Sequence, residues 1–167
     1  GRDPQTNLIA APDGLLYVIL RHHLIIGGGG RINDRVANSS NDYTFFSFNV
    51  ATNQFLPKAE IDENDIGDGV YKLSLINGDI YGMTSDDGGD EGQGVLFRYS
   101  TTEDTVYQVL SFDDNIAWGE SKVLLAPDGQ LIYTSNDGDY LEDGAIITVN
   151  AVTQESDIKV VFNEYPA

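Results

Sequence analysis

A unit of about fifty residues occurs three times in this chain, and this repeat restricts the possible folds more than any other feature. In each copy a short apolar segment runs into a turn that ends in glycine, and the apolar pattern then resumes. The turn glycines are Gly14, Gly78 and Gly129. Asn-Gly and Asp-Gly turns supply the positive φ angles that tight hairpins require, so each segment predicts a β-hairpin.

A second predicted hairpin follows the first one in every copy. Its first strand covers residues 43–48, 94–99 and 144–149. Its second strand ends at Ile61, Phe112 and Phe162. A polar turn connects the two strands in each case, so the sequence predicts four antiparallel strands per unit and twelve in all.

The spacing of the copies is constant, which distinguishes a true repeat from chance similarity between acidic loops. From the start to the end of the second hairpin the distance is 18 residues in every copy, and residues 43–78 align with residues 94–129 at a shift of 51 without a gap. Equivalent positions should therefore be buried together. They are Phe46, Phe97 and Ile147 in the third strand, and Ile61, Phe112 and Phe162 at the end of the fourth.

The repeat divides the chain into one array of three units followed by a short tail. Unit one covers residues 7–61 and carries an inserted loop at residues 21–42; unit two covers 62–112, unit three covers 113–162, and the tail is 163–167.

Four antiparallel strands per unit are compatible with two all-β folds. In a β-propeller each unit is a blade, and the blades pack face to face around an axis. A β-trefoil uses three such units and closes by itself. Alternation in the third strand, together with the almost continuous apolar run at Phe45 and Phe46, is compatible with both folds.

Unit two carries a motif that favours the propeller. The segment Gly78-Asp79-Ile80-Tyr81-Gly82-Met83-Thr84 is followed by Gly88-Gly89 and then by Gly94-Val95-Leu96-Phe97. Across residues 61–129 the chain resembles the G-x-L-Y-G-T-T…G-G-x-x-x-x-G-T-x-F repeat of bacterial exported proteins, the choice-of-anchor tandem-repeat GloVer-containing family. The resemblance implies propeller-like tandem blades and an extracellular or cell-surface location, and it carries over no activity.

Three blades are too few to close a ring, because propellers take about four to eight. The sequence therefore predicts apolar faces that remain open on units one and three. Two partners are expected to cover them: a second copy of the chain, giving a homo-oligomer, or further blades of a longer parent protein.

Charge and composition exclude several classes of function. Nine Lys and Arg residues against 27 Asp and Glu give a net charge of −18, a field that repels nucleic acid and anionic lipid. The chain contains no cysteine, which excludes disulfides and thiolate metal sites. It also has no apolar run long enough to insert into a membrane. Cations and neutral glycans are the ligands that this charge favours.

The loop between the second and third strands is acidic in units two and three, and it suggests a Ca²⁺ site. Candidate ligands are Asp86, Asp87 and Asp90 in unit two, and Asn136, Asp137 and Asp139 in unit three. Ca²⁺ takes about six to eight oxygen ligands, and glycine lets the backbone bend around the ion. Neither loop has the EF-hand spacing. The alternative is that these side chains cap solvated turns.

Two further features are candidates for binding or catalysis. Trp118 is a possible stacking platform for a sugar, although a single Trp at a unit junction also fits simple packing. Arg21, His22 and His23, with Tyr17 nearby, are the residue types used by some polysaccharide lyases on propeller scaffolds. Adjacent histidines on a strand point to opposite faces, and no paired carboxylates recur at a definable spacing.

The sequence therefore favours a non-enzymatic, extracellular structural or binding module that takes Ca²⁺, a glycan or another protein. The alternative is part of a carbohydrate-active enzyme such as a polysaccharide lyase.

Overall fold

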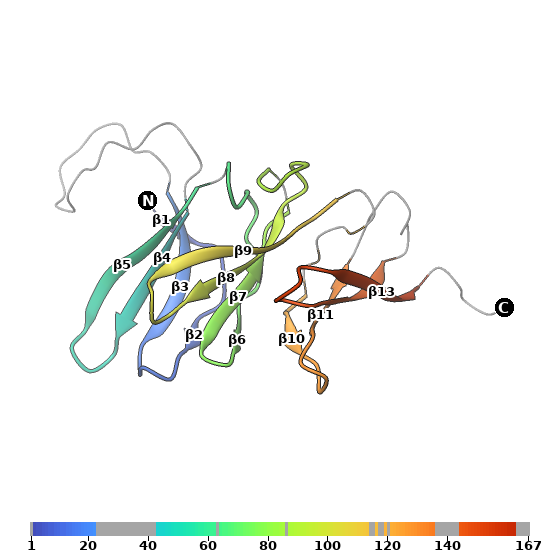
Figure 1. Cartoon of the computed structure of the whole chain (residues 1–167). Coiled ribbons are helices and arrows are strands. Elements are labelled where there is room, and N and C mark those ends of the chain that lie inside the picture. The colour runs from blue at the N-terminus through green and yellow to red at the C-terminus, as the bar shows by residue number, and fades with distance from the viewer. Residues whose placement is uncertain are drawn as a thin grey trace.

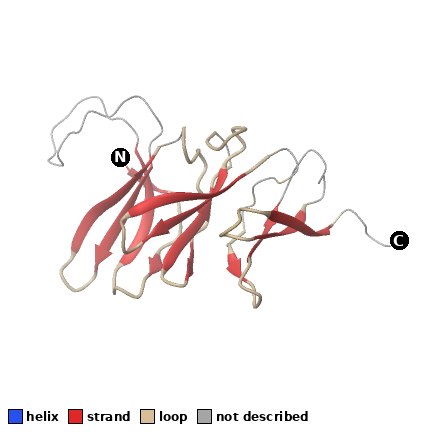
Figure 2. Cartoon of the chain, viewed as in Figure 1, coloured by secondary structure: helices blue, strands red, loops and turns tan. Residues whose placement is uncertain are grey.

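The chain forms three separate antiparallel β-sheets that stand in a row (Figure 1). The computed structural model describes residues 2–22, 43–62, 64–85, 87–113, 116, 119, 121–135 and 144–162. Within these residues the secondary structure is strand and turn, with no helix (Figure 2). The protein is therefore all-β, and each sheet is built from the strands of one unit.

The strands follow the chain order of the units. The first sheet holds β1 (Arg2–Pro4), β2 (Ile9–Ala10), β3 (Leu16–His22), β4 (Tyr43–Asn49) and β5 (Gln54–Ile61). The second holds β6 (Ser74–Ile76), β7 (Asp79–Met83), β8 (Val95–Ser100) and β9 (Thr105–Ser111). The third holds β10 (Leu124–Leu125), β11 (Leu131–Ser135), β12 (Ala145–Val149) and β13 (Ser156–Val161).

All twelve expected strands are present, and β1 is an additional one. Both β1 and β2 pair with the same edge of β3. Between them the backbone N–H of Ile19 donates to Thr6 Oγ1 at 3.1 Å, and its carbonyl accepts from Gln5 N at 3.0 Å. The edge strand of unit one is thus interrupted at the point where the Thr6 hydroxyl takes the place of a backbone carbonyl.

The same backbone irregularities recur in every unit. The pairing of the third and fourth strands shifts register at one equivalent place, between Thr44 and Phe46, Leu96 and Phe97, and Ile146 and Ile147. The turn after the third strand contains one left-handed residue at Asn53, Asp104 or Gln154. A shared β-bulge at one position is conformational detail that unrelated hairpins would not reproduce.

The three hairpin glycines also occupy equivalent turns. Gly14, Gly78 and Gly129 have φ angles of 82°, 94° and 85°, which favour glycine over residues with a Cβ. The turns differ in length, because Ala126–Gly129 repeats the hydrogen bonding of Ala11–Gly14, whereas unit two turns on Asn77 and Gly78 alone. The glycines therefore share their backbone conformation and their place between the first two strands, but the turn of unit two is shorter than the other two.

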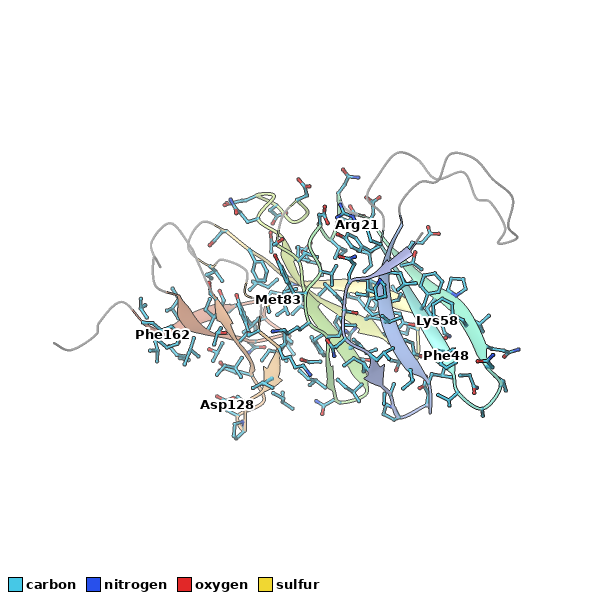
Figure 3. The ribbon with its side chains drawn as sticks, turned by 180° about the vertical axis from the view of Figure 1, so that it is seen from behind. Arg21, Phe48, Lys58, Met83, Asp128 and Phe162 are labelled. Atoms are coloured by element: carbon cyan, nitrogen blue, oxygen red, sulfur yellow. The ribbon has the colours of Figure 1, made fainter. Side chains whose placement is uncertain are left out.

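Alternation along the strands creates two cores, one on each side of the middle sheet. The first lies between units one and two and includes Tyr17, Ile19, Phe45, Ile80, Phe97 and Tyr99. The second lies between units two and three and includes Tyr81, Met83, Leu96, Phe112, Tyr133 and Ile147. Met83 lies between the second and third sheets in Figure 3. Unit two therefore buries one face against unit one and the other against unit three.

The burial of the equivalent positions agrees with the repeat at five sites and differs at one. Phe46, Phe97 and Ile147 are buried, as are Ile61 and Phe112. The prediction is wrong for Phe162, which is 44% exposed. Its backbone N–H still donates to Gly144 O at 3.0 Å, as that of Phe112 does to Gly94 O. The strand geometry is thus preserved, and Phe162 is exposed because no described residue packs on that face.

Candidate functional site

The outer face of unit three is the largest departure from the burial pattern of the other units. Ile132, Ile146, Val160 and Phe162 form this surface, here called the open face. Val160 is 45% exposed, and Ile132 and Ile146 are half-buried. The equivalent residues of unit two are Tyr81, Leu96, Leu110 and Phe112, all of which belong to the second core or pack against it.

Phe162 lies at the end of the molecule remote from unit one, at the outer limit of the third sheet (Figure 3). The equivalent faces of units one and two each pack against the unit that follows. The open face thus has the residues of an inter-unit contact.

The matching face of unit one is partly covered, but Phe55 on this face is 46% exposed. Val18, Leu20 and Phe46 occupy the side of unit one that faces away from unit two, yet all three are buried. The ring of Phe55 stacks on Phe46 with centroids 4.6 Å apart and planes 2° from parallel. An aromatic side chain of the same unit therefore covers part of this surface.

Hydrogen bonds between units one and two supplement the apolar core. The side-chain amide of Asn7 accepts from Leu73 N at 2.9 Å and donates to Leu73 O at 3.3 Å. These are the two hydrogen bonds that a neighbouring strand would make with Leu73. Asn7 lies just before β2 and Leu73 just before β6, so a single side chain links the two sheets.

A pair of tyrosines marks the hairpin end of the same interface. Tyr17 donates to Asp13 and Tyr99 to Asp104, both at 2.7 Å, and the two rings lie 5.7 Å apart. Burial, reinforced by these carboxylates, raises the pKa of both tyrosines above the ordinary value. Lys58 Nζ pairs with Asp104 at 3.1 Å.

The opposite end of β3 carries a second polar cluster. Arg21 pairs with Asp68 at 3.1 Å, and the Tyr43 hydroxyl donates to the same carboxylate while accepting from Gly69 N at 3.2 Å. Burial, with the contribution of Asp68, raises the pKa of Tyr43 to about 12. Asp68 ties β3 and β4 to the loop that enters unit two, a role that the sequence did not indicate.

The residues proposed for catalysis do not form a site within the described part of the chain. Tyr17 and Arg21 are four residues apart on β3, roughly 13 Å along the strand. Each is engaged by a different carboxylate at a different end of the sheet. His22 ends β3, and His23 lies outside the described residues.

The proposed Ca²⁺ ligands are only partly described. Asp87 and Asp90 lie in the exposed loop after β7, where Gly88 packs so closely that a Cβ would lie 2.3 Å from Gly67 N. The loop is held by Asp90 N, which donates to Ser111 Oγ at 2.8 Å. Asp86, Asn136, Asp137, Asp139 and Trp118 lie outside the described residues. Across the described ranges no three His, Cys, Asp or Glu side chains gather in a way that could hold a metal ion.

Comparison with known proteins provides no family assignment. No protein-family model matches the chain, and no curated protein shows significant similarity to it. None of the described segments is a helix with the length and apolarity that a membrane crossing requires.

Proposed function

We propose that this chain is a β-propeller-type repeat module with a structural or binding role outside the cell, and that its open face receives a further unit of the same kind. The observation that carries the proposal is the exposure of Val160 and Phe162 at positions where, in unit two, Leu110 packs against the second core and Phe112 is fully buried. The same packing joins units one and two and units two and three, so we expect a further unit to pack on the open face of unit three in the same way.

The arrangement of the sheets supports blades more than a trefoil. Each unit keeps its four principal strands in its own sheet, and the cores lie between sheets face to face, as in propellers. The short strands β2, β6 and β10 contact one another in sequence along one side. The resemblance of residues 61–129 to exported tandem-repeat proteins, together with the net charge of −18, supports a place outside the cell and a role with neutral or cationic ligands.

The partner that best fits the open face is a further repeat unit. An incoming unit must offer the apolar groups that unit three presents to unit two, such as Tyr133 and Ile147. In unit one the equivalent residues are Val18 and Phe46, which are already buried within the same copy. That face of unit one presents the exposed ring of Phe55 instead.

An added unit tests this proposal directly. Residues 62–112 are duplicated after Phe162, so that a copy of unit two follows unit three. The natural chain has no cysteine, so a single Val160→Cys substitution reports the open face through its rate of maleimide labelling. Val152→Cys is the matched control, because Val152 is 91% exposed at a hairpin tip away from this face.

We expect the added unit to slow labelling at position 160 by about tenfold or more and to leave labelling at position 152 unchanged, since a buried thiol reacts only when the contact opens. Equal labelling rates at position 160 with and without the added unit would contradict the proposal. Protection at position 160 in the unextended chain that increases with its concentration would instead assign the face to a second copy.

A further inference from the structure

A groove beside strands β6 and β10 lies apart from the open face. Its volume is about 430 Å³, within the range of about 300–1,000 Å³ that is typical of ligand sites. Strands β6 and β10, with the residues directly next to them, provide most of its walls. The residues used below are Ser74, Leu75, Lys122, Leu124 and Leu125.

The groove is bordered by the free edges of two strands. Both β6 and β10 are terminal strands of their sheets, so each pairs with only one neighbour among the described residues. Ile76 and Asp79 flank the two-residue turn and form a hydrogen-bonded pair, so the adjacent Leu75 directs its N–H and carbonyl away from β7. No described residue provides a hydrogen-bond partner for Leu75 on that side.

Asn7 shows that this edge accepts pairing of the kind a strand makes. Leu73 is two residues before Leu75, and strand alternation directs its backbone groups to the same side. The amide of Asn7 donates to the Leu73 carbonyl and accepts from its N–H. A peptide group placed two residues further along β6 could pair in the same way with the N–H and carbonyl of Leu75, which no described residue binds.

The side chains beside this edge suit an apolar segment. Leu75, Leu124 and Leu125 are 37%, 60% and 44% exposed, although leucine is most often buried. They come from the neighbouring strands β6 and β10 and line one groove. An extended chain placed between them would remove apolar surface from water on both sides.

Two polar groups in the groove have no partner among the residues that the structure describes. Ser74 is 7% exposed, and its buried hydroxyl has no hydrogen-bond partner among the described residues. Lys122 is exposed at the end of the groove and forms no ion pair with a described residue. The groove lining contains no Asp or Glu, in contrast to the net charge of −18 for the whole chain. A carboxylate is therefore the charged group that this site would accept.

We propose that the groove binds an extended peptide segment with apolar side chains and one carboxylate. The peptide pairs with the free edge of β6 at Leu75, its apolar side chains lie between Leu75 and Leu125, and its carboxylate lies near Lys122. Strand addition of this kind derives affinity from main-chain hydrogen bonds and selectivity from alternate side chains. The site is complete within the three units, so the proposal does not depend on the partner of the open face.

The test uses the whole chain and the probe Val-Thr-Val-Thr-Asp with a C-terminal amide and an uncharged fluorophore on its N-terminus, so that the Asp side chain is its one carboxylate. Fluorescence polarisation measures affinity, and amide chemical shifts of the ¹⁵N-labelled protein locate the contact. A second probe has Lys in place of Asp, and a third carries N-methyl groups on alternate amides, which remove the donors for strand pairing. Lys122→Glu is compared with Lys72→Glu, because Lys72 is an exposed lysine just before β6 that does not line the groove.

We expect binding in the range of about 10 μM to 1 mM. The Lys122→Glu change should weaken binding about tenfold, while Lys72→Glu should change it less than about twofold. Shift changes should centre on residues 73–76 and 124–125. Equal binding of the N-methylated probe, equal binding by the Lys122→Glu protein, or absence of binding at millimolar concentration would each overturn the proposal.

Discussion

Phe162 occupies in unit three the position that Phe112 occupies in unit two, with the same backbone hydrogen bond, yet Phe112 is fully buried and Phe162 is 44% exposed. The difference cannot come from local sequence, because both residues are phenylalanines at the end of a fourth strand. It comes from the neighbouring unit that covers Phe112. Burial in this array is thus a property of the contact between units.

The first prediction follows from this difference. Phe112→Ala should lower the free energy of unfolding by about 3–5 kcal/mol, because it removes a ring from a packed core. Phe162→Ala, the same substitution at the equivalent exposed position, should cost less than about 1 kcal/mol. Denaturant unfolding followed by circular dichroism measures both. Equal losses for the two variants would show that Phe162 is packed in solution.

The repeat spacing predicted much of the fold because it records geometry shared by all units. Hairpin length and the positions of Gly14, Gly78 and Gly129 are local properties, and the structure places them at equivalent turns. The interruption between β1 and β2 was missed because it depends on Thr6 meeting Ile19, a contact that the pattern of apolar residues does not contain.

The candidate sites were harder to predict, because they depend on contacts between units. Asp68 and Asn7 are ordinary polar residues in the sequence, and their roles arise only when adjacent sheets bring Arg21 and Leu73 to them. The sequence predicted Leu124 and Leu125 only as part of a hairpin strand, and it did not indicate that both are exposed in a groove. The sequence held one partial signal for the groove: a lysine, Lys72 or Lys122, comes just before the first strand of units two and three.

The second prediction concerns the link between units one and two. Asn7→Ala leaves the N–H and carbonyl of Leu73 without the partners that Asn7 provides, so it should cost about 1–3 kcal/mol. Asn7→Asp keeps the acceptor for Leu73 N but places a carboxylate beside Leu73 O, and should be at least as damaging. Asn49→Ala, which removes contacts within a single exposed turn, is the control. An Asn7→Ala protein as stable as the control would contradict the proposed link.

The third prediction tests the acidic loops for Ca²⁺. If they bind with the affinity of extracellular modules, about 10 mM Ca²⁺ should raise Tm by about 4–8 °C. Mg²⁺ at equal concentration is the control, since any cation reduces the self-repulsion of a chain with a net charge of −18. The double variant Asp87→Asn, Asp90→Asn should abolish part of the Ca²⁺-specific increase, whereas Asp128→Asn at an exposed hairpin should not. Identical shifts with Ca²⁺ and Mg²⁺ would assign the effect to screening.

The last prediction uses the tyrosines buried at the contacts between units. Tyr17, Tyr43, Tyr99 and Tyr133 all have raised pKa values, to about 12 for Tyr43, and burial is the largest cause in each case. The unfolded chain ionises its tyrosines near pH 10. A folded-state pKa above this value gives stability that is complete below about pH 10 and is lost as the pH rises toward the folded-state pKa.

We therefore expect the protein to lose stability steadily above about pH 10 and to unfold cooperatively in alkaline solution. Tyrosinate absorbance and circular dichroism should then change together, because Tyr133 and its counterparts at the other contact ionise only after the sheets separate. Tyr107 is partly exposed and has its hydroxyl bonded to Glu103 on the surface, so it provides an internal reference that can ionise before unfolding. A Tyr99→Phe variant should unfold at higher pH than the natural chain, once the stability lost with the Asp104 hydrogen bond is subtracted. The free energy of unfolding at neutral pH measures that loss separately. Titration of all tyrosines near pH 10 without any change in circular dichroism would show that the contacts between the units do not hold these side chains out of water.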